Sequence, residues 1–474
     1  MKCSLWNFSV KSKPSGESHV RFIKLLVLLS VLLPASKLPS QEQSQDKAKF
    51  EVDLSEFQKE IDKLTTKPYS LGGFAEFQPT LLGLNRDSAV SLARFYRNPQ
   101  GPLFDQYGLR LRLEGSYKKD WFSMFFKTDT LVRNDFQGWD ENTKLFEAYS
   151  SIKPKPEFIF EAGKKAMKWG KGYAWNPVNF IDRPKNPEDP EEALEGTTVA
   201  TADYIRSFEG PLKTLTLTTA LIPVYKYVNA KFGEPRRTNF ASKLYLLLYD
   251  TDIDFMVLTG QSRTTRYGFD FSRNLTTNLE LHGEFAVINN LDTMAINARG
   301  QAAKTQTDAL SHLIGLRYLS ENETTYFLEY YHNGAGFSRA QIKDFVSFVD
   351  HSYRTFVNTG NDSGLARAAN LLDGNYGRPN PGRHYLYFRA SQKEPFDILY
   401  FTPAVTSIMN LTDASLTVIP ELAYSPVTNL ELRFRTAFLV GKKATEYGEK
   451  QNDYRIEFRL RYYFGLESIL GAIF

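Results

Sequence analysis

The sequence lacks the features that mark several common protein classes. Its only cysteine among 474 residues is Cys3, which lies before an apolar run near the N-terminus. We expect Cys3 to be removed with a signal peptide, so the mature protein would have no disulfide bond and no thiol chemistry. After residue 36 no apolar run approaches the roughly 20 residues that a spanning helix needs, which excludes a helical membrane protein.

Motifs of nucleotide and metal sites are missing as well. The chain has no GxGxxG segment and no P-loop, and its histidines, cysteine and acids do not have the spacing of a zinc site or an EF-hand. A lipase of the outer membrane would need a Ser–His pair, but Ser311 and His312 would point to opposite faces of one strand. We therefore predict no catalytic residue, no metal and no cofactor, and expect that the protein is not an enzyme.

The N-terminus carries an export signal. Basic residues precede the apolar run from Leu25 to Ala35, which has the length of a signal-peptide core and is followed by small and polar residues. We assign residues 1–40 to a signal peptide cleaved between Ala35 and Ser40, with an N-terminal membrane anchor as the alternative. Its removal takes away six basic residues and one acidic residue, which turns the net charge of +4 into −1. Nothing in that charge suggests a nucleic-acid partner.

Residues 41–69 form the expected N-terminal periplasmic segment. Apolar residues between Val52 and Leu64 recur at helical spacing, which predicts a short amphipathic helix over 53–64. This helix could pack on the end of a larger fold, plug it, or bind a partner.

The stretch from Asp453 to Phe464 has the clearest period in the chain. Its apolar and charged residues alternate strictly, with one face ending in aromatic rings, and alternation is the period of a β-strand. A strand that crosses a bilayer needs about 9–11 residues at a 45° tilt. We interpret this stretch as the closing strand of a transmembrane β-barrel, with its charges facing a wet lumen.

Roughly eighteen strand-like segments fill residues 70–464. Short turn-like connections alternate with long ones, as in outer-membrane barrels with short periplasmic turns and long outer loops. The long connections are expected at 83–104, 134–142, 169–197, 224–237, 290–307, 334–382 and 441–451. The sequence thus predicts an all-β, antiparallel up-and-down barrel with both ends periplasmic and a tail at 465–474. Two short outer connections, near Gln261 and near Asp413, leave sixteen strands as an alternative.

Two of the long connections have a composition that indicates more than a linker. The connection 334–382 contains apolar residues at helical spacing, and we expect either a lid or constriction that folds inward or a cap on the surface. The connection 169–197 offers flat rings and hydrogen-bond donors. We predict that it either contacts a substrate or closes the lumen structurally, through Trp169, Lys171, Tyr173, Trp175 and Asn176.

Arginines recur on the charged face of the first and last strands. If the barrel closes, these strands are neighbours, and the arginines form one basic wall, paired in part with Glu114, Glu431 and Glu457. Paired charges would hold the lumen together, whereas unpaired ones would favour anions. The predicted pore-lining residues of this wall are Arg110, Arg112, Arg433, Arg435, Arg455, Arg459 and Arg461.

Short motifs add a family resemblance. Trp169-Gly170, Asn176-Pro177 and Asp182 resemble the WG…NP…D signature of porin-like Gram-negative outer-membrane barrels that are grouped near the alginate-export channels. The segments Phe401-Thr402-Pro403 and Pro420-Glu421-Leu422 extend the likeness. The resemblance implies an outer-membrane channel or transporter, and it implies neither a substrate nor a catalytic residue.

We therefore predict an outer-membrane porin-like channel for passive or facilitated passage of small solutes. The alternatives are a structural or adhesive barrel whose surface loops bind ligands and, least favoured, an outer-membrane lipid hydrolase. The expected partners are outer-membrane lipid, the barrel-assembly machinery and a small solute of unknown identity. The number of subunits is left open between monomer and trimer.

Overall fold

The computed structural model describes residues 68–136, 138–374 and 376–465. The predicted signal peptide, the helix at 53–64 and all but the first residue of the predicted tail lie outside these ranges. Of the helices in the described ranges, none combines the length and apolar character needed to cross a membrane.

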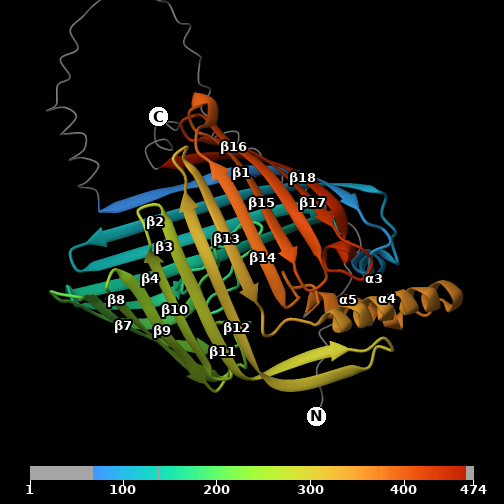
Figure 1. The fold of residues 1–474 in the computed structure, drawn as a ribbon, viewed down its shortest axis with the longest axis horizontal. Coiled ribbons are helices and arrows are strands. Elements are labelled where there is room, and N and C mark those ends of the chain that lie inside the picture. Colours follow the sequence, from blue (N-terminus) through green and yellow to red (C-terminus); the bar gives the residue numbers. More distant parts are fainter. Residues whose placement is uncertain (1–67, 137, 375, 466–474) are drawn as a thin grey trace, which may run out of the picture.

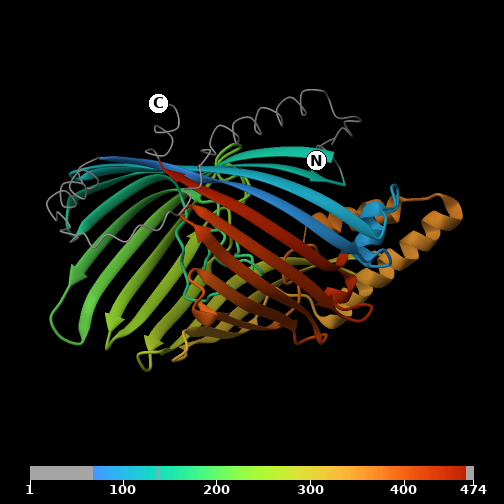
Figure 2. The ribbon, with the colours of Figure 1, turned by 90° about the horizontal axis from the view of Figure 1, so that it is seen from above.

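Eighteen antiparallel strands form one closed sheet, because β1 pairs with both β2 and β18 and every other strand pairs with its two neighbours along the chain (Figures 1 and 2). The predicted barrel is confirmed, and the sixteen-strand alternative is wrong. The strands are β1 (Tyr69–Leu84), β2 (Leu103–Lys119), β3 (Phe122–Asp135), β4 (Gly138–Lys155), β5 (Phe158–Lys165), β6 (Thr197–Ser207), β7 (Leu212–Val224), β8 (Arg237–Leu248), β9 (Thr251–Gly260), β10 (Arg266–Asn274), β11 (Leu279–Ile296), β12 (Ala302–Leu319), β13 (Thr324–His332), β14 (His384–Gln392), β15 (Phe401–Asn410), β16 (Ser415–Val427), β17 (Leu430–Val440) and β18 (Asn452–Gly465).

Side chains alternate across the barrel wall as the period of a strand requires. On β18, Phe458 and Leu460 are partly exposed on the outer face, whereas Glu457, which directly precedes Phe458, is buried inside. Large apolar side chains lie on the outer face of many strands, for example Phe160 on β5, Phe255 on β9 and Phe434 on β17, each more than 40% exposed. An apolar exterior around a polar lumen is the arrangement that a bilayer-spanning barrel requires.

The two ends of the barrel differ in their connections. One end carries short turns such as 120–121, 156–157 and 249–250. The opposite end carries the long segments 85–102, 166–196, 225–236, 333–383 and 441–451. The end with long segments is called the loop end below.

Two predicted long loops are wrong. Strands β3 and β4 continue through most of 134–142, and β11 and β12 continue through most of 290–307 as a long hairpin. Residues in this hairpin pair across the strands, for instance through the hydroxyls of Thr293 and Thr305 at 2.8 Å. Apolar residues such as Leu291, Met294 and Ile296 are mixed with polar ones on both faces there, so the strict alternation that reveals a strand is missing from the sequence.

A predicted short turn is wrong in the opposite sense. The strand expected from residue 395 begins only at Phe401, because a 3-10 turn at Pro395–Asp397 precedes it. Residues Glu394, Phe396, Asp397 and Tyr400 have positive φ angles, which a regular strand does not accommodate.

The connection between β13 and β14 forms a helical cap at the loop end (Figure 1). Helix α4 (Arg339–Thr359) begins with a capping box between Ser338 and Gln341 and ends at Gly360 with a φ of 76°, a left-handed conformation that favours glycine. Apolar side chains of α4 and α5 (Ser363–Asp373) pack with α3 (Ala89–Phe95) and with Ile296 at the tip of β11. The helices thus link the β1–β2 connection to the β11–β12 hairpin across the loop end.

An arginine on the outer face should destabilise the barrel in lipid. We expect Phe255→Arg, in the middle of β9, to reduce the free energy of unfolding by about 2–4 kcal/mol, because the charge would lie in hydrocarbon. Urea unfolding in lipid vesicles, followed by tryptophan fluorescence, measures this. Tyr227→Arg is the control, since Tyr227 is 86% exposed in a loop and should tolerate the charge. Equal stability of both variants would place Phe255 outside the lipid.

Candidate functional site

Residues 166–196, which connect β5 to β6, run inside the barrel and are called the inner loop below. Figure 2 shows this segment as a thin teal-to-green trace within the ring of strands. It contacts β11 and β13 on one side of the lumen and β17 and β18 on the other. The inner loop therefore crosses the space that a solute would have to pass.

Glu284 on β11 holds the first half of the inner loop. One of its carboxylate oxygens accepts hydrogen bonds from the backbone N–H groups of Lys171 at 2.7 Å and Gly172 at 2.6 Å, and from Nδ2 of Asn176 at 2.9 Å. The other oxygen accepts from the backbone N–H of Val178 at 3.3 Å. Glu284 is fully buried. These donors take the place of the water molecules that the carboxylate loses on burial.

Glu329 on β13 holds the next two residues in the same way. Its carboxylate accepts the backbone N–H of Tyr173 and, at 2.9 Å, that of Ala174. Nε2 of His282 lies 2.9 Å from the same carboxylate. Lys185 then joins the two halves of the loop by donating to the carbonyl oxygens of Gly172 and Tyr173 at 2.8 and 3.2 Å.

Apolar packing fixes the part of the inner loop that lies near β6 to β11. Trp169, Val178, Phe180 and Ile181 are almost fully buried in a cluster formed with lumen-facing side chains of these strands. At its start the loop is closed by Asp182, whose carboxylate accepts the backbone N–H groups of Met167 and Lys168 at 3.0 and 2.6 Å. This part of the lumen is filled by protein.

Two aromatic residues of the inner loop stack on the barrel wall. The Tyr173 ring lies 4.0 Å from that of Phe327, and the Trp175 ring lies 5.2 Å from that of Tyr331, both stacked. The Trp175 indole N–H donates to Asn380 at 3.1 Å, so the connection below the helical cap reaches into the lumen at this point.

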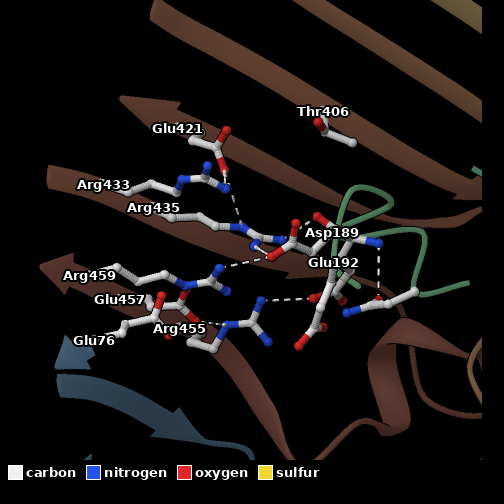
Figure 3. Close-up of polar contacts among 12 residues, drawn as sticks. Glu76, Asp189, Glu192, Thr406, Glu421, Arg433, Arg435, Arg455, Glu457 and Arg459 are labelled. Atoms are coloured by element: carbon white, nitrogen blue, oxygen red, sulfur yellow. Dashed lines mark hydrogen bonds and ion pairs between the residues drawn. The ribbon is translucent and has the colours of Figure 1, made fainter. Parts of the chain in front are cut away.

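The second half of the inner loop meets the arginine wall (Figure 3). Glu188 lies 2.7 Å from Arg455, and Asp189 lies 2.9 Å from Arg459 and 3.6 Å from Arg435. Arg435 also donates to the backbone carbonyl of Glu188. Further along, Glu192 lies 3.1 Å from Arg110.

Carboxylates of the strands complete the pairing of this wall. Arg112 lies 2.6 Å from Asp129, and Arg461 lies 2.6 Å from Glu76. Arg459 also lies 2.6 Å from Glu457, and Arg433 lies 3.0 Å from Glu431. Each arginine that the sequence singled out therefore has a carboxylate within 4 Å in the described structure.

The structure brings the predicted arginines together on one wall, because β17, β18, β1 and β2 are consecutive in the sheet. It gives the predicted inner-loop residues different surroundings. Trp169 is 2% exposed, and Asn176 caps Glu284. Nζ of Lys171 lies 3.1 Å from Asp254. Contact of any of these residues with a solute stays a prediction.

Sequence reasoning missed the acidic side of the lumen. Asp254 on β9 and Asp270 on β10 face each other in register, and both are buried, as are Glu284 on β11 and Glu329 on β13. The signal was present, since Asp252, Asp254, Glu280 and Glu284 have the parity of the inward face of their strands. The acids on the inner loop were missed as well, because no period governs a loop.

The four histidines on the strands separate into two sets. His282 faces the lumen, while His312, His332 and His384 lie in register on three neighbouring strands, with ring centroids 5.0 and 4.7 Å apart. Ser311 faces inward, and its Oγ accepts the backbone N–H of Gly334 at 3.0 Å. Ser311 and His312 thus point to opposite faces of β12, as predicted.

The sequence matches no model of a known protein family and no curated protein. Solved Gram-negative outer-membrane barrels are similar in fold, and they include porins, the class that the sequence resembles. OccK5 (OpdH) of Pseudomonas aeruginosa is 10% identical, over 84% of this chain and 98% of that chain, with a TM-score of 0.49. Wzi of Escherichia coli, described as a carbohydrate-binding β-barrel involved in group 1 capsule assembly, is 10% identical over 86% and 87% of the two chains, with a TM-score of 0.47. A triple mutant of the Rhodopseudomonas blastica porin is 11% identical over 84% and 100%, with a TM-score of 0.41. Because the identities are near 10% and the TM-scores are below 0.5, these likenesses do not indicate the function of this chain. The residues of its lumen do.

Removing the charge of Glu284 should loosen the inner loop. We expect Glu284→Gln to cost about 1–3 kcal/mol of loop docking, because an amide cannot accept all the donors that the carboxylate accepts. Trypsin cleavage after Lys171 or Lys185 in the folded protein should then accelerate. Glu280→Gln is the matched control on the same strand, two positions from His282. Equal cleavage rates in both variants would rule out Glu284 as the anchor.

Docking of the inner loop on the arginine wall should resist mild acid. Burial raises the pKa of Glu188 and Asp189, but the facing arginines outweigh burial and hold both below their ordinary values of 4.5 and 3.8. A carboxylate whose pKa is lowered by docking of the loop stabilises the docked state, fully so at pH values above its ordinary pKa. This stabilisation is lost as the pH falls through the lowered pKa. Conductance in planar bilayers should stay constant from about pH 7 to about pH 5 and change only below about pH 4. A change in conductance centred between about pH 5 and about pH 7 would contradict this.

Proposed function

We propose that this protein is a channel in the outer membrane that passes small polar solutes by passive or facilitated diffusion. One observation carries the proposal: the inner loop crosses the lumen and is tied to both sides of it, by Glu284 and Glu329 on one side and by Arg455 and Arg459 on the other. A loop held in this way narrows a water-filled barrel to a constriction of fixed shape. Selection then depends on the width of the constriction and on the charges around it.

The charges of the lumen are separated between two sides. Arginines dominate β17, β18 and β2, while buried carboxylates lie on β9, β10, β11 and β13, namely Asp254, Asp270, Glu284 and Glu329. Charges of opposite sign on facing walls orient a solute that has a dipole or several polar groups, and they hold back apolar solutes, which gain nothing from either wall. We therefore propose polar molecules as the transported class.

The position in the membrane follows from the apolar outer face, which needs lipid around it. We place the loop end at the cell surface and the short turns in the periplasm. We further propose that residues 1–40 direct export, and that the barrel-assembly machinery inserts the chain into the membrane. None of these steps calls for a metal, a cofactor or covalent chemistry.

Neutralising the acids of the inner loop should change ion selectivity. In the Glu188→Gln/Asp189→Asn variant, Arg435, Arg455 and Arg459 lose their partners on the loop, so the permeability of chloride relative to potassium should rise several-fold. Reversal potentials in planar bilayers under a salt gradient measure this ratio. Glu191→Gln is the control, because the Glu191 carboxylate instead accepts the Tyr173 hydroxyl at 3.0 Å.

The channel itself is tested with the unaltered protein. Purified protein should give stepwise conductance in planar bilayers, and liposomes that contain it should swell in sugars, amino acids and organic acids. A protein that binds cells or matrix but gives neither conductance nor swelling would be a structural or adhesive barrel. Hydrolysis of lipid esters would point to an enzyme.

A further inference from the structure

A polar cavity separate from the constriction lies near the loop end, where the inner loop meets β5 and β6. It encloses about 660 Å³ and is lined by Lys144 and Leu145 within β4, by the end of β5 and the start of β6, by 181–184 of the inner loop and by 227–232 of the next connection. None of its lining residues belongs to the arginine wall. It is called the rim cavity below.

Cations outnumber acids around the rim cavity. Its lining includes five basic side chains and two acidic ones, which gives a net charge of +3. The basic residues are Lys144, Lys164, Arg183, Lys231 and Arg263, and the acidic ones are Asp182 and Glu195.

The two acids do not neutralise the five cations. Glu195 is shared by three of them, Lys164 at 2.6 Å, Arg183 at 2.7 Å and Lys144 at 3.9 Å. Asp182 is occupied by the backbone N–H groups of Met167 and Lys168. Lys144 and Arg183 keep 40% and 47% of their side-chain surface exposed, so both can turn toward an additional anion.

The cavity lies at a gap in the barrel wall: Lys144 of its lining pairs in register with the lumen-facing Asp129, whereas other lining residues belong to the outer face. Lys164 shares the parity of Phe160, which is 45% exposed on the outer face of β5, and Lys164 pairs with Thr198, another lining residue. Leu145 of β4 lines the cavity and is also 45% exposed. The wall is low here, because β5 ends at Lys165 while β4 begins further out, at Gly138.

Below the rim cavity, the exposed apolar surface continues down the outer face of β5 through Phe160 and Phe158. An anion whose apolar chains lie on this surface would place its charged group at the level of the cavity. Lys and Arg are the side chains that recognise phosphate, and basic clusters at a membrane interface attract anionic headgroups.

We propose that the rim cavity binds the phosphate-bearing headgroup of a lipid of the outer leaflet, with Lys144, Lys164 and Arg183 as the contacting cations. Two features favour a lipid over a free anion: the cavity reaches the outer face through Lys164 and Leu145, and there it adjoins apolar surface that acyl chains would cover. The site is separate from the constriction, so the channel activity and the lipid site are tested independently.

The test measures lipid binding to the full mature protein in detergent by native mass spectrometry. The probes are phosphorylated lipid A, the same lipid after removal of its phosphates, and inorganic phosphate as a competitor. Phosphorylated lipid A should bind more tightly than the dephosphorylated form, and millimolar inorganic phosphate should compete poorly. In the Lys144→Gln/Lys164→Gln variant, affinity for phosphorylated lipid A should fall about thirtyfold, and affinity for the dephosphorylated form should not change.

Two further variants keep the result interpretable. Lys213→Gln/Lys393→Gln removes two lysines that face carboxylates near the opposite end of the barrel, Asp250 at 2.5 Å and Glu323 at 4.0 Å, and it should bind as the unaltered protein does. Lys144→Arg/Lys164→Arg keeps the charge and should retain binding. Unchanged affinity in the glutamine variant, or equal loss in the distant control, would overturn the proposal. Effective competition by inorganic phosphate would overturn the lipid assignment in favour of a free anion.

Discussion

The structure depends on the requirement that no backbone hydrogen-bonding group be left unpaired in hydrocarbon. An open sheet has two edges, and this chain removes both by pairing β1 with β18 over almost their full length, from Gly72 with Gly465 to Leu84 with Asn452. Closure then dictates the rest of the pattern. With lipid on one side of the sheet, the strands present apolar residues outward, and their inward residues are polar except where the inner loop packs on β6 to β11.

Closure of eighteen strands also gives a wide lumen, which the inner loop narrows. A wide ring of polar side chains would hold a broad aqueous pore, and a loop that enters it has backbone groups that need partners. Here the barrel wall supplies those partners as carboxylates, since Glu284 and Glu329 accept the N–H groups of the loop that water would otherwise take. A buried carboxylate without such donors would be costly. The wall therefore supplies acceptors for the N–H groups of the loop, and the loop supplies donors for the carboxylates of the wall.

The sequence predicts what repeats with a short period and fails where no period exists. The alternation in Asp453–Phe464 is enough to place β18, its charged face and the arginine wall, because sequential strands are neighbours in an up-and-down barrel. The β11–β12 hairpin was missed beyond residue 289 because polar and apolar residues are mixed on both of its faces there. For the inner loop the sequence left open whether Trp169 contacts a substrate or closes the lumen, because it does not show which way a loop folds; in the structure Trp169 is buried. The contact of Asp189 with Arg435 and Arg459 was beyond prediction for the same reason: it joins segments about 250 residues apart through a loop conformation that only the packed structure defines.

That contact explains how so many arginines can lie together on one wall. Arg435 has only 3% of its side chain exposed, and an unpaired buried guanidinium would be strongly destabilising. The strands alone offer it Glu421, at 3.9 Å, and the inner loop adds Asp189 at 3.6 Å together with the backbone carbonyl of Glu188. The inner loop is therefore part of the charge balance of the wall as well as the obstacle in the lumen. It follows that the width of the constriction and the charge of the arginine wall are coupled: a displacement of the loop that widens the passage also uncovers positive charge beside it.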